Sequence, residues 1–308
     1  MTKMAMIEYF LILRPLSLTC SVIATIVTAA VVANGEREIF FSFRFFRALM
    51  MAISIQLGAN LTNTYYDFLN GVDTVNDKQK EYRVDNGLAT GAVSIRGIQA
   101  LMYFLYAIGL LCIFPVFLTT ENPFISIIFA FGIFLAYFYT ASLHGFGGLK
   151  YLALGDVIIF LCFGPLLMQG VSIILKDSMD TQLYIYSVPL GLLSMAILHV
   201  NNTRDIETDA AAGVTTLANI IGYKLSYYLY ITLFILSYFS SLAIATYRNW
   251  LCLLTFATIP IAMNLVETFR KGDLECMPQM TSKLHLPFGI LLFVGIFFSN
   301  RGLFDFLY

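Results

Sequence analysis

Long apolar stretches without Asp, Glu, Lys or Arg dominate the chain, and each is 17 to 28 residues long. A helix needs about 20 apolar residues to cross the ~30 Å hydrocarbon layer of a membrane. Such a segment must be helical, because hydrocarbon offers no partner to unpaired backbone groups. The pattern therefore predicts an all-α integral membrane protein with nine transmembrane helices in one bundle, at residues 15–35, 48–66, 97–120, 122–149, 157–175, 181–203, 225–247, 249–266 and 284–300.

The composition agrees with a surface that meets lipid. Charged residues are 12% of the 308 residues, whereas soluble domains carry about 25%. The net charge is −1, so no basic surface is available to neutralise phosphates, and we expect no nucleic-acid partner. We interpret residues 1–308 as a single domain whose main partner is the lipid bilayer.

The basic residues are divided unequally between the two sides of the predicted bundle. Twelve Lys and Arg residues lie on the side of the N-terminus and six on the other side. The positive-inside rule therefore places the N-terminus in the cytoplasm. The same side receives the long polar loops after the second span (about 70–96) and the sixth span (about 205–224). We expect these two loops to cap the functional end of the bundle, because functional residues concentrate on loops held by a rigid scaffold.

An acidic motif ends the second predicted span. Asn63 and Asp67 are four residues apart, so they share one face of a helix. Asp73 lies six residues beyond Asp67 and cannot join that face on a regular helix. Gly71 allows the helix to end and turn, which could bring Asp73 back toward the same point.

A second acidic motif ends the sixth predicted span, and it repeats the Asn-x-x-x-Asp pattern of the first. Asn201, Asp205 and Asp209 follow one another at four-residue intervals. Carboxylates are costly inside a membrane, so two matching clusters call for a compensating cation. Carboxylate and amide oxygens are hard ligands suited to Mg²⁺, which proteins often hold through one or two carboxylates plus substrate phosphates. The sequence therefore predicts a diphosphate bound between the motifs through Mg²⁺.

These motifs resemble those of the UbiA superfamily of intramembrane aromatic prenyltransferases. Residues 63–68 (Asn-Thr-Tyr-Tyr-Asp-Phe) with Gly71-Val-Asp73 look like the first motif of the 1,4-dihydroxy-2-naphthoate polyprenyltransferases of menaquinone (vitamin K2) synthesis, and equally like that of the animal enzyme that makes menaquinone-4. Residues 201–217 are similar to the second motif of both, and residues 139–156 to the segment between spans four and five. The resemblance covers about residues 10 to 300. Thr64 departs from superfamily members that have Asp at this position.

The resemblance implies a nine-helix bundle around a cavity open to lipid, and a Mg²⁺-dependent transfer of a polyprenyl group from its diphosphate to an aromatic quinone precursor. It implies Asn63, Asp67 and Asp73 as metal ligands of the first motif, and Asp205 and Asp209 as ligands of the second.

Further candidate residues surround the two motifs. Arg204 and Arg83 could bind phosphate oxygens, and Arg204 lies between the acids. Lys150 and Asp156 could orient or deprotonate the acceptor, although Asp156 could equally be a salt-bridged helix start. Tyr66 and Tyr139 could shield a carbocation through their π faces or simply pack in the membrane. We assign catalysis to Asp67, Asp205, Arg204, Asp156 and Lys150, and substrate binding to Asn60, Asn63, Tyr66, Asp73, Arg83, Tyr139, Asn201, Asn202 and Asp209.

Alternatives remain open at the level of the sequence. The acceptor could be dihydroxynaphthoate, menadiol or another aromatic compound such as 4-hydroxybenzoate, and the prenyl length is not determined. A cation-coupled membrane carrier would also use intramembrane acids, but carriers commonly contain inverted repeats, whereas these motifs recur in one orientation. Only some fourteen residues precede the first span, which favours a bacterial plasma membrane over an endoplasmic reticulum or Golgi membrane.

Overall fold

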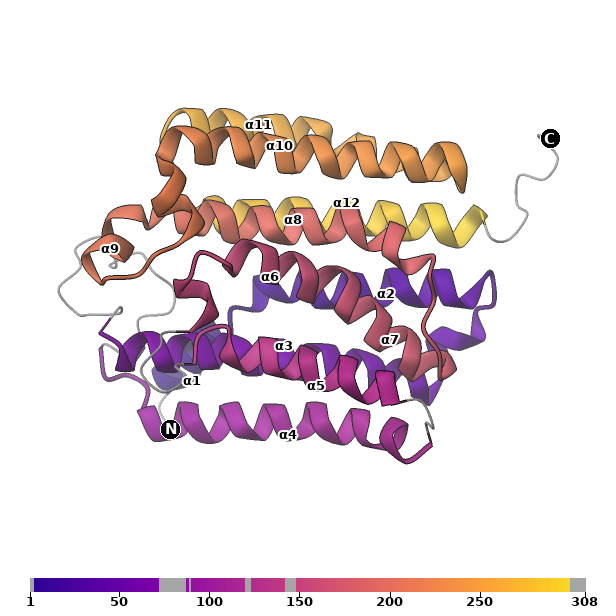
Figure 1. Ribbon diagram of the computed structural model, residues 1–308, viewed down its shortest axis with the longest axis horizontal. Coiled ribbons are helices and arrows are strands. Elements are labelled where there is room, and N and C mark those ends of the chain that lie inside the picture. Colours follow the sequence, from indigo (N-terminus) through magenta and orange to yellow (C-terminus); the bar gives the residue numbers. More distant parts are fainter. Residues whose placement is uncertain (1–2, 72–86, 89, 120–122, 142–147, 300–308) are drawn as a thin grey trace.

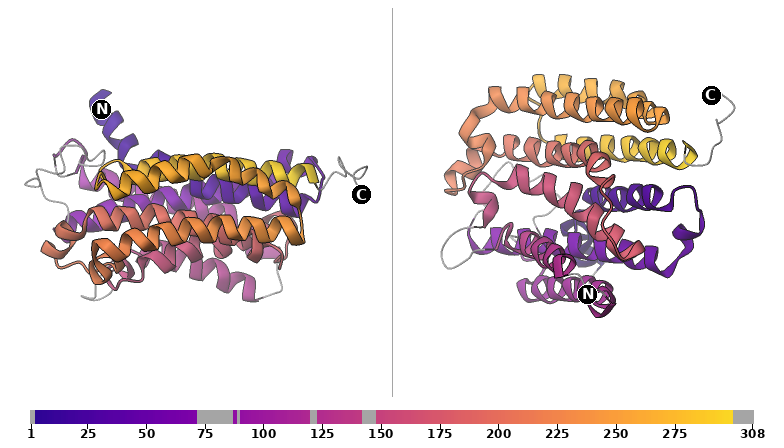
Figure 2. Two further views of the ribbon diagram at one scale, coloured as in Figure 1. Left: turned by 90° about the horizontal axis from the view of Figure 1, so that it is seen from above. Right: turned by 45° about the vertical axis from the view of Figure 1, so that its right-hand side comes forward.

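The computed structural model describes residues 3–71, 87–88, 90–119, 123–141 and 148–299, and in these ranges the chain is helical apart from loops and one isolated β-bridge. The main α-helices are α1 (Lys3–Ile12), α2 (Leu18–Ala33), α3 (Phe43–Leu69), α4 (Ile95–Thr119), α5 (Pro123–Phe138), α6 (Gly155–Leu161), α7 (Leu167–Lys176), α8 (Leu183–Arg204), α10 (Leu217–Tyr247), α11 (Ile259–Arg270) and α12 (Met277–Ser299). Most of them lie side by side with nearly parallel axes (Figure 1), and α1 is an exception (Figure 2). Short helical segments are η1 (Pro15–Ser17), η2 (Glu38–Phe41), η4 (Leu149–Tyr151), η5 (Cys162–Leu166), α9 (Ile206–Ala211) and η6 (Trp250–Thr258).

Eight helical segments of the described ranges are long and apolar enough to cross a membrane, and some of them consist of two or three consecutive helical elements. The predicted all-α membrane architecture is therefore confirmed. The apolar part of α5, Ile125–Phe138, is shorter than the other spans. The predicted count of nine is not confirmed, and the assignment of one domain to residues 1–308 stays a prediction.

The fourth span differs most from its prediction, because α5 ends at Phe138 and not near residue 149. The backbone N–H of Lys150 donates to the carbonyl of Tyr139 at 2.9 Å, so the chain folds back over the end of α5. The absence of charged residues from 139–149 did not correctly predict the end of the helix. Residues 142–147 lie outside the described residues, and Gly148, where the description resumes, is a residue type that disfavours a helix.

The helical path is interrupted at two places, between α1 and α2 and between α6 and α7. Arg14 has a φ of 53° and is followed by Pro15, which separates α1 from α2. Gly164, with φ −98° and ψ −109°, precedes Pro165 and kinks the chain between α6 and α7. Figure 2 shows α1 projecting away from the axis of the bundle. Both breaks lie beside the cavity described below.

The outer faces of the bundle are apolar. Phe104 and Leu111 on α4 and Phe239 on α10 are largely exposed in the isolated chain. Large exposed apolar side chains on a soluble surface would favour association, whereas in a bilayer they contact lipid. The outer surface thus agrees with the membrane location predicted from composition.

The two predicted cap loops are described to different extents. α3 ends at Leu69 with Asn70 as its C-cap, and the next residue, Gly71, has a φ of 70°, so the expected turn is present. Asp73 and Arg83 lie outside the described residues, and their predicted roles stay predictions. The second loop contains the short helix α9 and a turn that leads into α10. Thr216 is the N-cap of α10 and forms a capping box with Asn219. Nδ2 of Asn219 donates to the carbonyl of Ile206 at 2.7 Å, which joins α9 to α10.

Candidate functional site

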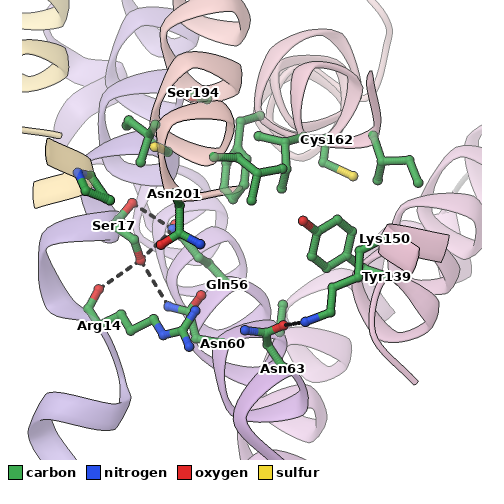
Figure 3. Close-up of a pocket in the computed structure, with 18 of the residues that line it drawn as sticks. Arg14, Ser17, Gln56, Asn60, Asn63, Tyr139, Lys150, Cys162, Ser194 and Asn201 are labelled. Carbon is green, nitrogen blue, oxygen red and sulfur yellow. Dashed lines mark hydrogen bonds between the residues drawn. The ribbon is translucent and has the colours of Figure 1, made fainter. Parts of the chain in front are cut away.

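A cavity of about 1280 Å³ opens at the end of the bundle where α3 and α8 finish. Figure 3 shows polar side chains from several helices pointing into it. Most of the candidate residues from the sequence line this one space: Asn60, Asn63, Asp67, Tyr139, Lys150, Asn201, Asn202, Arg204, Asp205 and Asp209. Two motifs 138 residues apart in sequence (201 minus 63) therefore face a common cavity.

The first motif presents its oxygens to a single cation. Nζ of Lys150 donates to Oδ1 of Asn63 at 2.6 Å and to both carboxylate oxygens of Asp67 at 2.7 Å. This shared contact confirms that Asn63 and Asp67 lie on one face of α3. Both charged side chains are mostly buried, so their attraction is screened less than at an exposed surface.

Lys150 reaches α3 because hydrogen bonds hold the chain on both sides of it, at Thr140 and at Ala153. Thr140 donates from Oγ1 to Oδ1 of Asn63 at 3.0 Å, and Lys150 bonds the carbonyl of Tyr139 through its backbone. Beyond Lys150, the N–H of Ala153 donates to the carbonyl of Thr215 at 3.0 Å. The segment therefore joins the first motif to the loop that follows the second.

The second motif carries its own cation. Nε of Arg204 donates to Oδ1 of Asp205 at 2.8 Å, and its Nη2 donates to Oδ2 of Asp205 at 2.7 Å and to Oδ1 of Asn201 at 2.9 Å. Asp205 ends α8, so Asp209 lies on the separate helix α9 and not on a continuation of the same helix. The backbone N–H of Asp209 still donates to the carbonyl of Asp205 at 2.8 Å, which keeps one helical step between the two acids.

The donor set of both motifs fits a hard divalent cation. Carboxylate and amide oxygens of Asn63 and Asp67 converge on one ammonium, and those of Asn201 and Asp205 converge on one guanidinium. Among the described residues, no group of three or more His, Cys, Asp and Glu side chains could hold a metal alone. Mg²⁺ would therefore need amide oxygens and substrate phosphates in addition, which is its usual mode of binding.

Tyr139 lies between the first motif and α6, and it lines the cavity. Burial raises the pKa of its hydroxyl well above the usual value, and the nearby carboxylates of Asp156 and Asp67 raise it further. The phenol is thus neutral and available as a hydrogen-bond donor. Tyr66 is placed differently: its hydroxyl bonds that of Tyr137 at 2.9 Å, and it is not part of the cavity lining.

Asp156 also lies away from the cavity surface. Oδ1 of its buried carboxylate is 3.0 Å from Nδ1 of His199, which the sequence analysis had not assigned. Nε2 of His199 is 3.2 Å from the carbonyl of Ser226, so that nitrogen must carry the hydrogen. The pair joins α6 to α8 and α10. Of the two alternatives for Asp156, the structure favours the paired helix start over direct contact with a substrate.

Some residues that line the cavity were not predicted from the sequence. Arg14, Ser17 and Gln56 line the wall opposite Lys150 (Figure 3), although none belongs to the acidic motifs. Gln56 stands four residues before Asn60, on the helical face that carries the first motif. A polar side chain inside an apolar span at this spacing was the signal that could have identified it.

Known UbiA proteins resemble this chain in sequence and in fold. The model of the UbiA prenyltransferase family matches residues 21–277. UbiA prenyltransferase domain-containing protein 1 of Dictyostelium discoideum is 35% identical over 94% of this chain and 86% of its own length. The protein of the same name from Homo sapiens is 32% identical over 96% of this chain and 85% of its own length. These relatives are eukaryotic, which weakens the predicted bacterial plasma membrane.

Solved structures share the fold at low sequence identity. A UbiA homolog from Aeropyrum pernix superposes with a TM-score of 0.68 at 13% identity, covering 90% of this chain and 97% of the other. A UbiA homolog from Archaeoglobus fulgidus bound to GPP and Mg²⁺ gives a TM-score of 0.60 at 14% identity, covering 93% and 99%. The all-helical membrane architecture is thus shared with solved proteins.

Proposed function

Since this chain belongs to the UbiA prenyltransferase family, we propose that it transfers a polyprenyl group to a naphthoquinol precursor of menaquinone, 1,4-dihydroxy-2-naphthoate or menadiol. One observation carries the site assignment: Asp67 and Asp205, each beside a cation, line the same cavity. The motif sequences around these acids support the choice of a naphthoquinol. Family membership favours a transferase over a cation-coupled carrier.

The two motifs would hold the diphosphate through Mg²⁺. We assign Asn63, Asp67, Asp205 and Asp209 as its ligands in the described part of the chain, with Asp73 beyond it. The ion supplies neutralisation of the charge that develops on the leaving diphosphate. When substrate binds, Lys150 and Arg204 are in place to donate hydrogen bonds to phosphate oxygens, since each already lies beside a carboxylate in the cavity.

The reaction breaks the bond between the allylic carbon and the diphosphate oxygen and forms a bond from that carbon to the ring. The ring then loses a proton or, from a carboxylated position, carbon dioxide. Water would intercept the cation, so the cavity must exclude it. Apolar residues from several helices form much of the cavity wall, among them Ile55, Ile133 and Leu167. This wall suits a polyprenyl tail and an aromatic acceptor that both partition into lipid.

The orientation with a cytoplasmic N-terminus is part of the proposal. It would place the open polar end of the cavity on the cytoplasmic side, where the polar diphosphate group can enter from water. The eukaryotic relatives favour an internal membrane such as the endoplasmic reticulum or Golgi over a bacterial plasma membrane.

An acceptor comparison tests the proposed function. The purified protein in detergent is supplied with labelled geranylgeranyl diphosphate, Mg²⁺ and one acceptor at a time under reducing conditions. We expect prenylated product from dihydroxynaphthoate or menadiol. Product from 4-hydroxybenzoate alone would contradict the naphthoquinol assignment, and no product from any acceptor at several prenyl lengths would contradict the transferase assignment for this chain.

Gly148 provides a prediction about the placement of Lys150. A Cβ on Gly148 would overlap the backbone carbonyl of Thr140, and backbone cannot move aside as a flexible side chain can. Gly148→Ala should therefore displace the segment that carries Lys150 from Asn63 and Asp67. We expect the rate of transfer to fall by about 10- to 100-fold, since small misplacements of catalytic groups are costly. Initial rates at saturating substrates measure this, and a parental rate would contradict the assigned role of the segment.

A further inference from the structure

The polar residues of the cavity continue below the acidic motifs on two helices at matching positions. On α3, Gln56 precedes Asn63 by seven residues and Asp67 by eleven. On α8, Ser194 precedes Asn201 by seven residues and Asp205 by eleven. All six side chains line the cavity. The seven-residue interval keeps each group on one helical face and places Gln56 and Ser194 about 10 Å deeper than the asparagines.

The amide of Gln56 forms hydrogen bonds through its nitrogen and not through its oxygen within the described residues. Its Nε2 donates to the carbonyl of Ser17 at 2.7 Å and to the hydroxyl of Ser17 at 3.1 Å. A carbonyl accepts hydrogen bonds and cannot donate them, so this contact fixes which end of the amide is nitrogen. The side chain is buried, and its Oε1 has no hydrogen-bond partner among the residues that the structure describes. A buried acceptor without a partner is unfavourable and calls for an explanation.

The bend between α1 and α2 holds this amide in place. Nδ2 of Asn60 donates to the carbonyl of Leu13 at 2.9 Å and to the hydroxyl of Ser17 at 3.0 Å. Ser17 in turn donates to the carbonyl of Arg14 at 2.8 Å. These contacts bind the bend to α3, and Figure 3 shows Arg14, Ser17, Gln56 and Asn60 grouped there. Because the donor side of Gln56 is already engaged, its oxygen is the part of the amide left for a ligand.

Ser194 is the corresponding polar group on α8. Its hydroxyl is 3.4 Å from Nε2 of His285 on α12, and both side chains are buried. The hydroxyl keeps further capacity for hydrogen bonds, because it can donate once and accept twice. The cavity therefore has a second polar level at Gln56 and Ser194, below the level of the acids.

We propose that Gln56 and Ser194 bind the oxygen substituents of the aromatic acceptor, with Gln56 accepting a hydrogen bond from a ring hydroxyl. The inference rests on the proposed transfer to a naphthoquinol. The diphosphate would lie beside Asp67 and Asp205. The hydrocarbon tail of the prenyl group cannot form hydrogen bonds with Gln56 or Ser194. An aromatic diol, by contrast, offers the hydroxyl hydrogen that the oxygen of Gln56 lacks, and it must lie beside the reacting end of the prenyl group.

Gln56→Met tests this assignment, because Met has a similar length and no hydrogen-bonding amide. We expect the KM for the naphthoquinol to rise about 10-fold, with the KM for the prenyl diphosphate unchanged. A naphthoquinol with its hydroxyl methylated should bind the parent and the variant alike. Ser194→Ala, a smaller change, should raise the acceptor KM several-fold. An acceptor KM within about twofold of the parent for both variants would overturn the proposal.

Gln169→Met is the matched control. Gln169 is a buried glutamine on α7 whose amide exchanges two bonds with the backbone of Asp180, at 2.7 Å and 3.0 Å, and it is not part of the cavity lining. Its replacement should lower the thermal stability and leave the acceptor KM at the parental value. An equal rise in acceptor KM in this control would show that the effect of Gln56→Met is not local, and would overturn the proposal.

A binding measurement separates the failure of this inference from the failure of the proposed function. The naphthoquinol alone, without prenyl diphosphate, should raise the unfolding temperature of the parent, and Gln56→Met should need about 10-fold more naphthoquinol for the same rise. This result would support the acceptor subsite even where turnover is absent. Turnover by the parent with equal stabilisation of parent and variant would reject the subsite and keep the function. No stabilisation of the parent by either naphthoquinol would reject the subsite directly.

Discussion

Asp67→Asn is expected to lower the rate of prenyl transfer by about 100- to 1000-fold, the range seen when one group that stabilises transition-state charge is removed. The substitution keeps the shape of the side chain and its place beside Asn63, but it removes the negative charge that attracts a cation. Asp67 meets Lys150 through both of its oxygens, so the loss affects the metal ligand and the counter-charge of Lys150 together. Initial rates with labelled prenyl diphosphate measure the effect.

A matched substitution at the other end of the bundle controls for general damage. Asp177 forms an ion pair with Arg44, and both side chains are about half exposed. Exposed ion pairs contribute little to stability. Asp177→Asn should therefore retain the parental rate. An Asp67→Asn protein that is folded and works at the parental rate would contradict the role of Asp67.

Asp205→Asn should cause a loss of similar size, about 100- to 1000-fold. Both carboxylate oxygens of Asp205 bond Arg204, which also bonds Asn201. The variant loses the charge that orders this arrangement, and the diphosphate loses one side of its binding site. We expect the double variant with Asp67→Asn to be little worse than either single variant, since groups that act as a unit are not additive. Rates of the three proteins at saturating substrates measure this.

Independent and multiplied losses in the double variant would contradict a shared diphosphate site. Thermal unfolding in detergent serves as the control, because a variant that unfolds early reports on stability and not on chemistry. Replacement of a mostly buried acid that is bonded to Arg204 should itself lower stability moderately, since Arg204 then loses its counter-charge.

Local spacing was sufficient to predict which residues share a helical face. Asn63 and Asp67 converge on one ammonium as the four-residue interval predicted. α3 ends just before Gly71, whose φ is positive, so the predicted helix end is present. These features depend on a few neighbouring residues, so the sequence contains the information needed to predict them.

Features that depend on distant segments could not be derived in this way. The predicted fourth span ends early at Phe138, and the backbone N–H of Lys150 bonds the carbonyl of Tyr139; lack of charge alone could not predict where the helix ends. The burial of Asp156 against His199 depends on how α6 packs on α8. The state of Oε1 of Gln56 depends on the bend at Ser17, which bonds the amide nitrogen, so the sequence alone could not predict it.

We propose that prenyl transfer requires a divalent cation held by both acidic motifs. The most direct test is the rate of formation of lipid-soluble label by the purified parent protein, with a naphthoquinol acceptor and labelled geranylgeranyl diphosphate, as Mg²⁺ is titrated after treatment with EDTA. We predict no product in EDTA, a saturable recovery with Mg²⁺, and no comparable recovery in Asp67→Asn or Asp205→Asn. An undiminished rate in EDTA, or full recovery in both variants, would contradict a metal-dependent transfer through the two motifs.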